Sequence, residues 1–147
     1  MIREFEFYHG AALARLIHSS YPVSIKLYPT PSNASYIINN KVGLYLKHSS
    51  QRMTPWRFSF SRGHQEEISE IKEKIGKVVI GLICYDDGVV GLNYEEFNDL
   101  LTNINRGTEW ICVSRKAKHK YSVKGSDGKL HYKIGEGEFA QKVLELP

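Results

Sequence analysis

Apolar and polar residues alternate along this chain in short blocks, and most blocks predict one element of secondary structure. In residues 8–17 the apolar side chains recur at helical spacing, which predicts an amphipathic helix whose apolar face needs a sheet to cover it. Residues 23–28 alternate with a period of two, as a half-buried strand does. Residues 35–38 and 42–48 predict two further strands, and the asparagines of 39–41 suit a tight turn because asparagine tolerates left-handed backbone. We therefore expect a helix, a strand and a hairpin.

The middle of the chain continues with a strand, a helix and a second hairpin. Residues 56–60 put three aromatic side chains on one face of a strand. Ser61 can cap the helix that follows, and Gly76 supplies its end. Residues 78–85 are almost all apolar, as in a strand covered on both faces, and an Asp-Gly turn leads into 89–92. This apolar hairpin is the predicted centre of the sheet.

The last third carries one well-marked helix and several short strands. Asn93 and Glu96 have the spacing of a capping box, so a helix should begin directly after Asn93. Residues 110–114 and 121–124 predict two strands, residues 130–134 predict a short edge strand, and a docked segment of undetermined type ends the chain. The predicted apolar face of the helix consists of Phe97, Leu100, Leu101 and Ile104.

Together these elements predict one α+β domain of the three-layer kind, with a central mixed β-sheet flanked by helices. We expect residues 1–147 to form this single domain, since no linker is long enough to divide it. Residues 8–92 make the core, and residues 93–147 add a helix and a β-extension. With 41% hydrophobic residues in 147, the chain can bury a sizeable core.

Composition narrows the class of protein only moderately. No apolar stretch approaches the roughly 20 residues that a membrane helix needs, and residues 1–6 are too polar and acidic for a signal peptide, so a cytoplasmic location without membrane contact is expected. Cys84 and Cys112 each lie in an apolar run and are predicted to be reduced core thiols. The net charge of +4 permits nucleic-acid binding without requiring it.

Within residues 8–92, Lys47 lies near the end of an apolar strand, before an aromatic strand, a helix and a buried hairpin. This order resembles the core of the PD-(D/E)xK nuclease superfamily, which includes restriction endonucleases and Holliday-junction resolvases. The resemblance implies a restriction-endonuclease-like core and identifies Lys47 with the lysine of that motif. The motif's acid, two residues earlier, is replaced by Tyr45. The region of its aspartate contains Ser32, Asn33 and Ser35.

The missing acids change the predicted chemistry. Metal-dependent phosphodiester hydrolysis needs hard oxygen ligands that hold Mg²⁺, and tyrosine and asparagine do not replace carboxylates there. A lysine can still contact a phosphate without the metal. One alternative keeps catalysis: Glu66 and Glu67, in the first turn of the next helix, would be migrated carboxylates that act with Lys47 and Mg²⁺. Acids in a first turn also complement the helix dipole, which needs no active site.

A basic run between the strands at 110–114 and 121–124 offers a second candidate surface. Clustered cations can follow a nucleic-acid backbone while a nearby ring, Trp110 or Tyr121, stacks on a base or sugar. A lysine-rich turn that keeps a sheet edge soluble explains the same residues, and both alternatives stay open. The predicted nucleic-acid contacts are Lys47, Arg57, Arg115, Lys116, Lys118 and Lys120.

Other motifs point to structure rather than chemistry. Asp86 and Asp87 precede a glycine and favour a hairpin turn over a metal site. The six histidines lack the spacing of a zinc site. His48 adjoins Lys47, but strand alternation should send it to the opposite face of the sheet.

The sequence thus predicts a nucleic-acid-binding, catalytically inactive nuclease-like domain, with DNA the favoured ligand, no cofactor, and an accessory role in DNA defence or repair as one form of this function. The first alternative is the Mg²⁺-dependent nuclease that uses Lys47 with Glu66 or Glu67. The second is a protein-interaction module without a nucleic-acid role, presenting an aromatic surface to a homodimer mate or a partner subunit.

Overall fold

The computed structural model describes residues 1–101 and 107–147, within which four helices and eight strands form. In chain order the elements are α1 (Glu4–Ile17), β1 (Ile25–Leu27), β2 (Ser35–Ile38), β3 (Val42–Ser49), β4 (Trp56–Phe60), α2 (Arg62–Ile75), β5 (Val78–Cys84), β6 (Gly88–Asn93), α3 (Tyr94–Leu100), β7 (Glu109–Ser114), β8 (Ser122–Gly125) and α4 (Glu138–Leu144).

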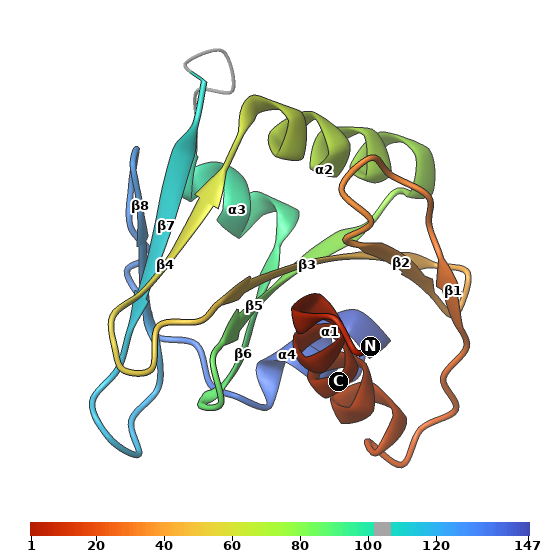
Figure 1. Ribbon diagram of the computed structural model, residues 1–147, viewed down its shortest axis with the longest axis horizontal. Coiled ribbons are helices and arrows are strands. Elements are labelled where there is room, and N and C mark those ends of the chain that lie inside the picture. Colours follow the sequence, from red (N-terminus) through yellow and green to blue (C-terminus); the bar gives the residue numbers. More distant parts are fainter. Residues whose placement is uncertain (102–106) are drawn as a thin grey trace.

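The five-stranded sheet A has the order β1-β2-β3-β5-β6 (Figure 1). β3 and β5 are parallel, because β4 and α2 carry the chain across between them, and the other neighbours are antiparallel. The predicted β2–β3 hairpin is confirmed, and Asn39 and Asn40 occupy its turn with φ of 53° and 55°, the left-handed geometry that asparagine tolerates. The Asp-Gly hairpin between β5 and β6 is confirmed as well.

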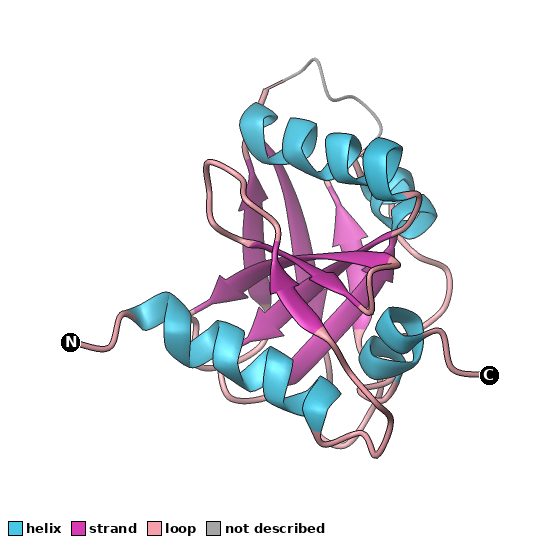
Figure 2. Ribbon diagram, turned by 90° about the vertical axis from the view of Figure 1, so that its right-hand side faces the viewer, coloured by secondary structure: helices cyan, strands magenta, loops and turns pink. Residues whose placement is uncertain are grey.

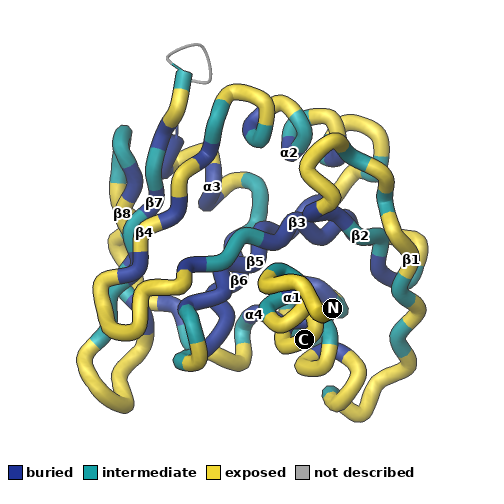
Figure 3. Tube along the Cα trace, in the orientation of Figure 1, coloured by how far each residue is buried: buried dark blue, intermediate teal, exposed yellow. Residues whose placement is uncertain are grey.

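Helices cover both faces of sheet A, so the predicted α+β fold with a central mixed sheet is confirmed. α1 and α4 lie on one face and α2 and α3 on the other (Figures 1 and 2). β3, β5 and β6 are almost entirely buried between the helices, whereas β1 at the sheet edge is largely exposed. Exposed residues concentrate in the loops and on the outer sides of α1 and α2 (Figure 3). The side of α1 and α4 has its own apolar core around Leu16, Leu44 and Phe139, separate from the core around Ile68 and Phe97 on the opposite face.

β4 departs from the expected core, because it does not join sheet A. It pairs with β7 and β8 in an antiparallel three-stranded sheet B, which stands beside the sheet A layers (Figure 1). The alternation of the strand was predicted correctly: Trp56, Phe58 and Phe60 are buried and the residues between them are exposed. Sequence alternation identifies the buried face of a strand but does not identify its neighbours.

α2 and α3 begin as the capping signals predict. Ser61 accepts a hydrogen bond from the His64 backbone, and Gly76 ends α2 with a φ of 97°. Asn93 and Glu96 form the reciprocal capping box of α3. α3 ends at Leu100, and the predicted core position Ile104 lies outside the described residues.

α2 lies unusually close to β3, and this closeness positions the site described below. A Cβ on Gly43 of β3 would overlap the side chain of Ile71 in α2. The absence of a side chain at this position therefore lets α2 approach the strand that carries Lys47.

Several expectations about the ends of elements need correction. α1 begins at Glu4 rather than at residue 8, and the final segment forms α4. Residues 130–134 form no strand; isolated bridges at Lys129 and Ile134 flank this segment. Of the two predicted core thiols, Cys84 is buried, but Cys112 is only half-buried because it faces outward on sheet B. In the described parts of the chain, no helix has both the length and the apolar character needed to cross a membrane.

Candidate functional site

A pocket of about 270 Å³ opens where β3 outruns its hairpin partner. β2 pairs with β3 only as far as Tyr45, whereas β5 follows the strand to Ser49. The last residues of β3 therefore have a strand neighbour on one side only. We call this cavity the Lys47 pocket. Its walls come from α1, the loop before β2, β3 and α2, and include Phe5, His9, Asn33, Lys47, His48 and His64.

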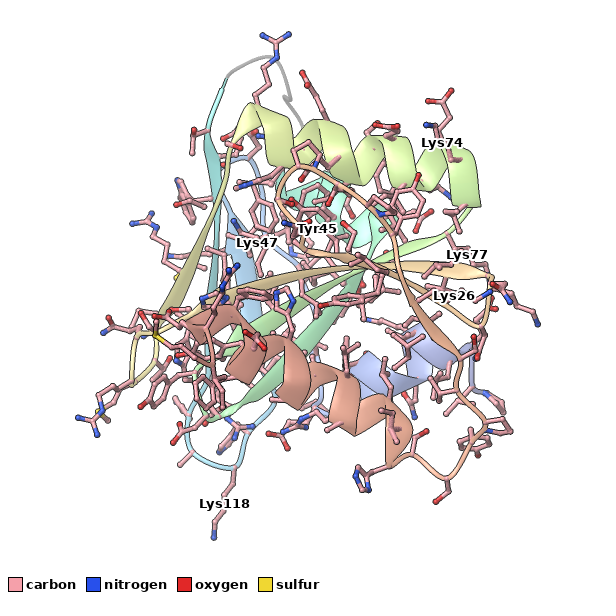
Figure 4. The ribbon with its side chains drawn as sticks, turned by 45° about the vertical axis from the view of Figure 1, so that its right-hand side comes forward. Lys26, Tyr45, Lys47, Lys74, Lys77 and Lys118 are labelled. Atoms are coloured by element: carbon pink, nitrogen blue, oxygen red, sulfur yellow. The ribbon has the colours of Figure 1, made fainter. Side chains whose placement is uncertain are left out.

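The Lys47 side chain points toward α2, as Tyr45 does, and the two lie close together between the helices in Figure 4. Its Nζ lies 3.3 Å from Nδ1 of His64 and 5.3 Å from the centre of the Phe60 ring. Burial lowers the pKa of Lys47, and the charge of Glu67 opposes this effect in part. The result is a half-buried ammonium against an imidazole and an aromatic ring.

His64 is held as a neutral ring. Its Nδ1 accepts a hydrogen bond from the backbone N–H of Ser61 at 3.2 Å, so this nitrogen carries no proton and can also accept from Lys47. Burial and the neighbouring ammonium both lower the pKa of His64. The cap of α2 thereby fixes the ring that orients Lys47.

Glu67 connects the loop before β2 to β3 and α2. Its Oε1 accepts hydrogen bonds from the Tyr45 hydroxyl at 2.6 Å and the Ser32 hydroxyl at 2.8 Å, and its Oε2 accepts from the Ser32 backbone at 3.1 Å. Burial and this carboxylate raise the pKa of Tyr45. We call these three residues the Glu67 clamp, since both carboxylate oxygens are occupied by protein donors.

Ser32, one of the residues in the region where the resemblance expects the motif's aspartate, lies beside Tyr45, which replaces the motif's acid. The hydroxyls of Ser32 and Tyr45 are 3.3 Å apart, and Lys47 is two residues further along β3. Of the predicted migrated acids, Glu67 joins this cluster. Glu66 does not: its side chain is 59% exposed and pairs with Arg62 at the surface.

His9 and His48 form the wall on the α1 side. His48 stacks on Tyr8 at 4.3 Å and contacts Glu4, so strand alternation sends it to the face opposite Lys47, as predicted. His9 is buried with its Nδ1 2.8 Å from the Tyr36 hydroxyl, and burial, assisted by the charge of His48, lowers its pKa to about 4.

The donor set of the Lys47 pocket does not fit Mg²⁺. Glu67 supplies a single carboxylate whose oxygens already accept three hydrogen bonds, and a neighbouring ammonium would repel a cation. Among the described residues, no group of three or more histidine, cysteine, aspartate or glutamate side chains is arranged to hold a metal ion.

The other predicted phosphate contacts lie outside this pocket. Arg115 packs over Tyr121 and pairs with Asp87 at 2.9 Å and with Glu136 at 3.5 Å, so its charge is committed to the fold. Tyr121 is fully buried and cannot stack on a base, contrary to the sequence interpretation. The structure stacks Arg57, in β4, on Trp110, with 4.4 Å between the guanidinium carbon and the ring centre.

The lysines of the basic run, by contrast, remain exposed. Lys116, Lys118 and Lys120 lie in the loop between β7 and β8, and Lys118 projects away from the body of the protein, far from Lys47 (Figure 4). The backbone of Arg115 donates to Thr54, so the β3–β4 loop, which carries the exposed Arg52, lies beside this basic loop.

Sequence reasoning found Lys47 and Glu67 but missed Ser32 as a clamp residue and His64 as the lysine's partner. His64 takes the third position of α2, where a glutamate or glutamine usually signals a capping box, so no familiar motif marked it. Comparison with protein-family models, curated proteins and solved structures finds no match to this chain.

Proposed function

We propose that this protein is a nucleic-acid-binding domain without metal-dependent cleavage, and that the Lys47 pocket receives a backbone phosphate. One observation carries the proposal: the half-buried ammonium of Lys47 has no carboxylate within 4.0 Å among the described residues. Other cations of the fold, such as Lys142 and Arg115, pair with acids. A cation that is partly removed from water and forms no direct ion pair favours an anionic ligand.

The chemistry of the pocket suits a phosphate ester. His64 takes one of the three ammonium donors, so two remain for phosphate oxygens. The Asn33 amide lines the same space and can add a donor. The Glu67 clamp keeps the nearest carboxylate engaged with its own donors, which limits its repulsion of an anion.

Nucleic acid is the favoured source of that phosphate for two reasons. DNA is the ligand that the resemblance of the sequence around Lys47 to the PD-(D/E)xK nucleases implies. Arg52 and the exposed lysines of the β7–β8 loop add positive charge that an extended polyanion could reach. An accessory role in DNA defence or repair, in the cytoplasm, is the form of this function that we favour.

Fluorescence anisotropy with labelled duplex and single-stranded DNA, repeated at several salt concentrations, tests the proposal. We expect saturable binding whose affinity falls steeply with salt, and a loss of affinity in Lys47→Ala. Inorganic phosphate should compete at millimolar rather than molar concentration if the pocket is a true phosphate site. Weak binding that does not change with salt contradicts the proposal.

A second candidate is metal-dependent cleavage, and one observation favours it: Lys47 and Glu67 share the site. The donor set described above opposes it. Incubation of plasmid with the protein and Mg²⁺ or Mn²⁺ separates the two candidates. We expect intact plasmid, whereas cleavage that disappears in both Lys47→Ala and Glu67→Gln would support the enzyme and refute the proposed function.

A further inference from the structure

Among the described residues, no helix covers the side of sheet B that faces away from sheet A. Alternation along β4, β7 and β8 sends every second side chain outward, and Figure 1 shows no helix against this side in the described part of the chain. We call this surface the outer face of sheet B. Its outward residues are Arg57, Ser59, Trp110, Cys112, Ser114, Ser122 and Lys124.

The outer face of sheet B carries positive charge and no negative charge. The seven outward residues include two cations, one tryptophan and three serines, but no carboxylate. The only acid of these strands, Glu109, points inward and is buried. The face therefore complements an anion, and its neighbour at one end is the basic β7–β8 loop.

Trp110 and Arg57 form a stacking platform on this face. The guanidinium carbon lies 4.4 Å from the centre of the ring, so the two planar groups cover each other. Nucleic-acid bases stack on guanidinium planes as well as on aromatic rings, so either group can present a surface to a base. Trp110 is half-exposed, whereas Trp56, the other tryptophan, is 2% exposed and unavailable.

The register places a second cation on the same row as Arg57. Arg57 is paired with Cys112, and Cys112 is paired with Lys124 on the next strand. Two strand spacings, roughly 10 Å, therefore separate the backbones of Arg57 and Lys124. A single strand laid across the sheet could contact both cations through its phosphates while a base stacks on the platform.

We infer that the outer face of sheet B binds single-stranded nucleic acid through base stacking on the Arg57–Trp110 pair and phosphate contacts to Arg57 and Lys124. Single strands are favoured over duplex because a duplex hides its base faces within its own stack. The inference rests on the proposed function only for the class of ligand, since this face and the Lys47 pocket are separate.

The rate at which a reagent labels Cys112 can report binding at this face without any substitution. Cys112 lies between Arg57 and Lys124 and is half-buried, whereas Cys84 is buried. A thiol-reactive reagent should therefore label Cys112 and spare Cys84. Saturating oligothymidylate of about 12 nucleotides should slow this labelling several-fold. An unchanged labelling rate at saturation overturns the inference.

Substitutions of Trp110 test the stacking contribution. We expect Trp110→Ala to weaken binding of the same oligonucleotide roughly 5- to 150-fold, and Trp110→Phe to retain most of it. Tyr21→Ala is the matched control, because Tyr21 is an exposed aromatic residue between α1 and β1, outside sheet B, and it should bind as the wild type does. Circular dichroism and thermal melting confirm that each variant is folded. Equal affinity of Trp110→Ala and Tyr21→Ala overturns the inference.

Further binding measurements identify the class of ligand and distinguish binding at the outer face of sheet B from binding at the Lys47 pocket. An abasic strand carries the same charge without bases, so it should bind several-fold more weakly; equal binding overturns the stacking role. Polyglutamate that binds as tightly as oligothymidylate would indicate an acidic protein partner and also overturns it. If Lys47→Ala weakens binding and Trp110→Ala does not, the proposed function stands and this inference falls. If Trp110→Ala weakens binding and Lys47→Ala does not, this inference stands and the phosphate role of the Lys47 pocket falls.

Discussion

Replacement of Lys47 by methionine should separate binding from stability. Methionine is similar in length to lysine but carries no charge, so Lys47→Met removes the proposed phosphate contact and fills the same space. Lys74→Met is the matched control, since it removes one positive charge from an exposed residue that pairs with Glu70. Figure 4 shows Lys74 at the far end of α2 from Lys47. A difference between the two variants therefore reports on the pocket rather than on net charge.

The expected loss of affinity follows from one charge-assisted contact. Hydrogen bonds to charged groups contribute about 1.5–3 kcal/mol, which corresponds to roughly 10- to 150-fold in Kd. Loss of one phosphate contact should also reduce the slope of log K against log salt by about 0.9 for duplex and about 0.7 for single strands. Lys74→Met should leave both quantities close to the wild type.

Lys47→Met should stabilise the fold even though it weakens binding. The contact between Lys47 and the Phe60 ring is of the cation–π kind, worth about 0.5–1 kcal/mol, and a methionine sulfur near the same ring contributes about 0.3–1.5 kcal/mol. These two contributions offset each other. The variant also loses the hydrogen bond to His64, worth about 0.5–1.5 kcal/mol, but it no longer holds an ammonium partly out of water, which costs more. We expect Lys47→Met to raise the free energy of unfolding by about 0.5–2 kcal/mol.

Anisotropy titrations at four or more salt concentrations and urea unfolding measure both effects. Weaker DNA binding together with greater stability would identify Lys47 as a group kept for its ligand at a cost to the fold. The reasoning is refuted if Lys47→Met binds DNA as Lys74→Met does, or if it unfolds more easily than the wild type.

Three further predictions test the surroundings of the pocket. Tyr45→Phe removes the hydroxyl that donates to Glu67 and should lower the free energy of unfolding by about 1–3 kcal/mol in urea; an unchanged midpoint would contradict the clamp. Gly43→Ala should cost about 1–3 kcal/mol by crowding α2, whereas Gly10→Ala, in open space on α1, should gain about 0.5–1 kcal/mol; equal melting temperatures would contradict this packing. His9 should titrate by NMR with a pKa of about 4. The free energy of unfolding should fall as the pH drops from 6.5 toward 4, because the unfolded chain binds a proton at His9 that the folded chain does not bind. An NMR titration midpoint near 6.5 would contradict the burial of His9.

The parts of the fold that depend on local signals were predictable from sequence. The Asn39-Asn40 turn, the Ser61 cap, the left-handed Gly76 and the capping box at Asn93 each satisfy a backbone requirement within a few residues. The apolar hairpin was equally clear, because its residues are buried on both faces of sheet A. Such features need little knowledge of tertiary contacts.

The features that were missed depend on pairing between distant segments. The alternation in 56–60 suits a strand of sheet A or of sheet B. β4 belongs to sheet B because it pairs with β7, about 50 residues later in the chain. Tyr121 was read as a surface aromatic, but its hydroxyl bonds to Asp87 beneath Arg115. The basic run thus contains one structural arginine among exposed lysines, a distinction that composition does not carry.

In the candidate site, too, local patterns identified some residues and only the tertiary structure identified the others. The strand pattern identified Lys47, and the helix start drew attention to Glu66 and Glu67 without distinguishing them. Helix geometry decides between these two: Glu67 turns toward Ser32 and β3, while Glu66 faces solvent and pairs with Arg62. A helix start predicted within one or two residues cannot make that distinction.

The most direct test of the central claim is an NMR titration of ¹⁵N-labelled protein with a short DNA duplex, followed through the backbone amides. The account predicts that Asn33, Lys47 and His48 shift along a saturable curve, that Lys74 does not move, and that inorganic phosphate moves the same amides in the same direction. Saturable DNA binding that leaves these three amides unperturbed would contradict the claim that the Lys47 pocket holds the phosphate.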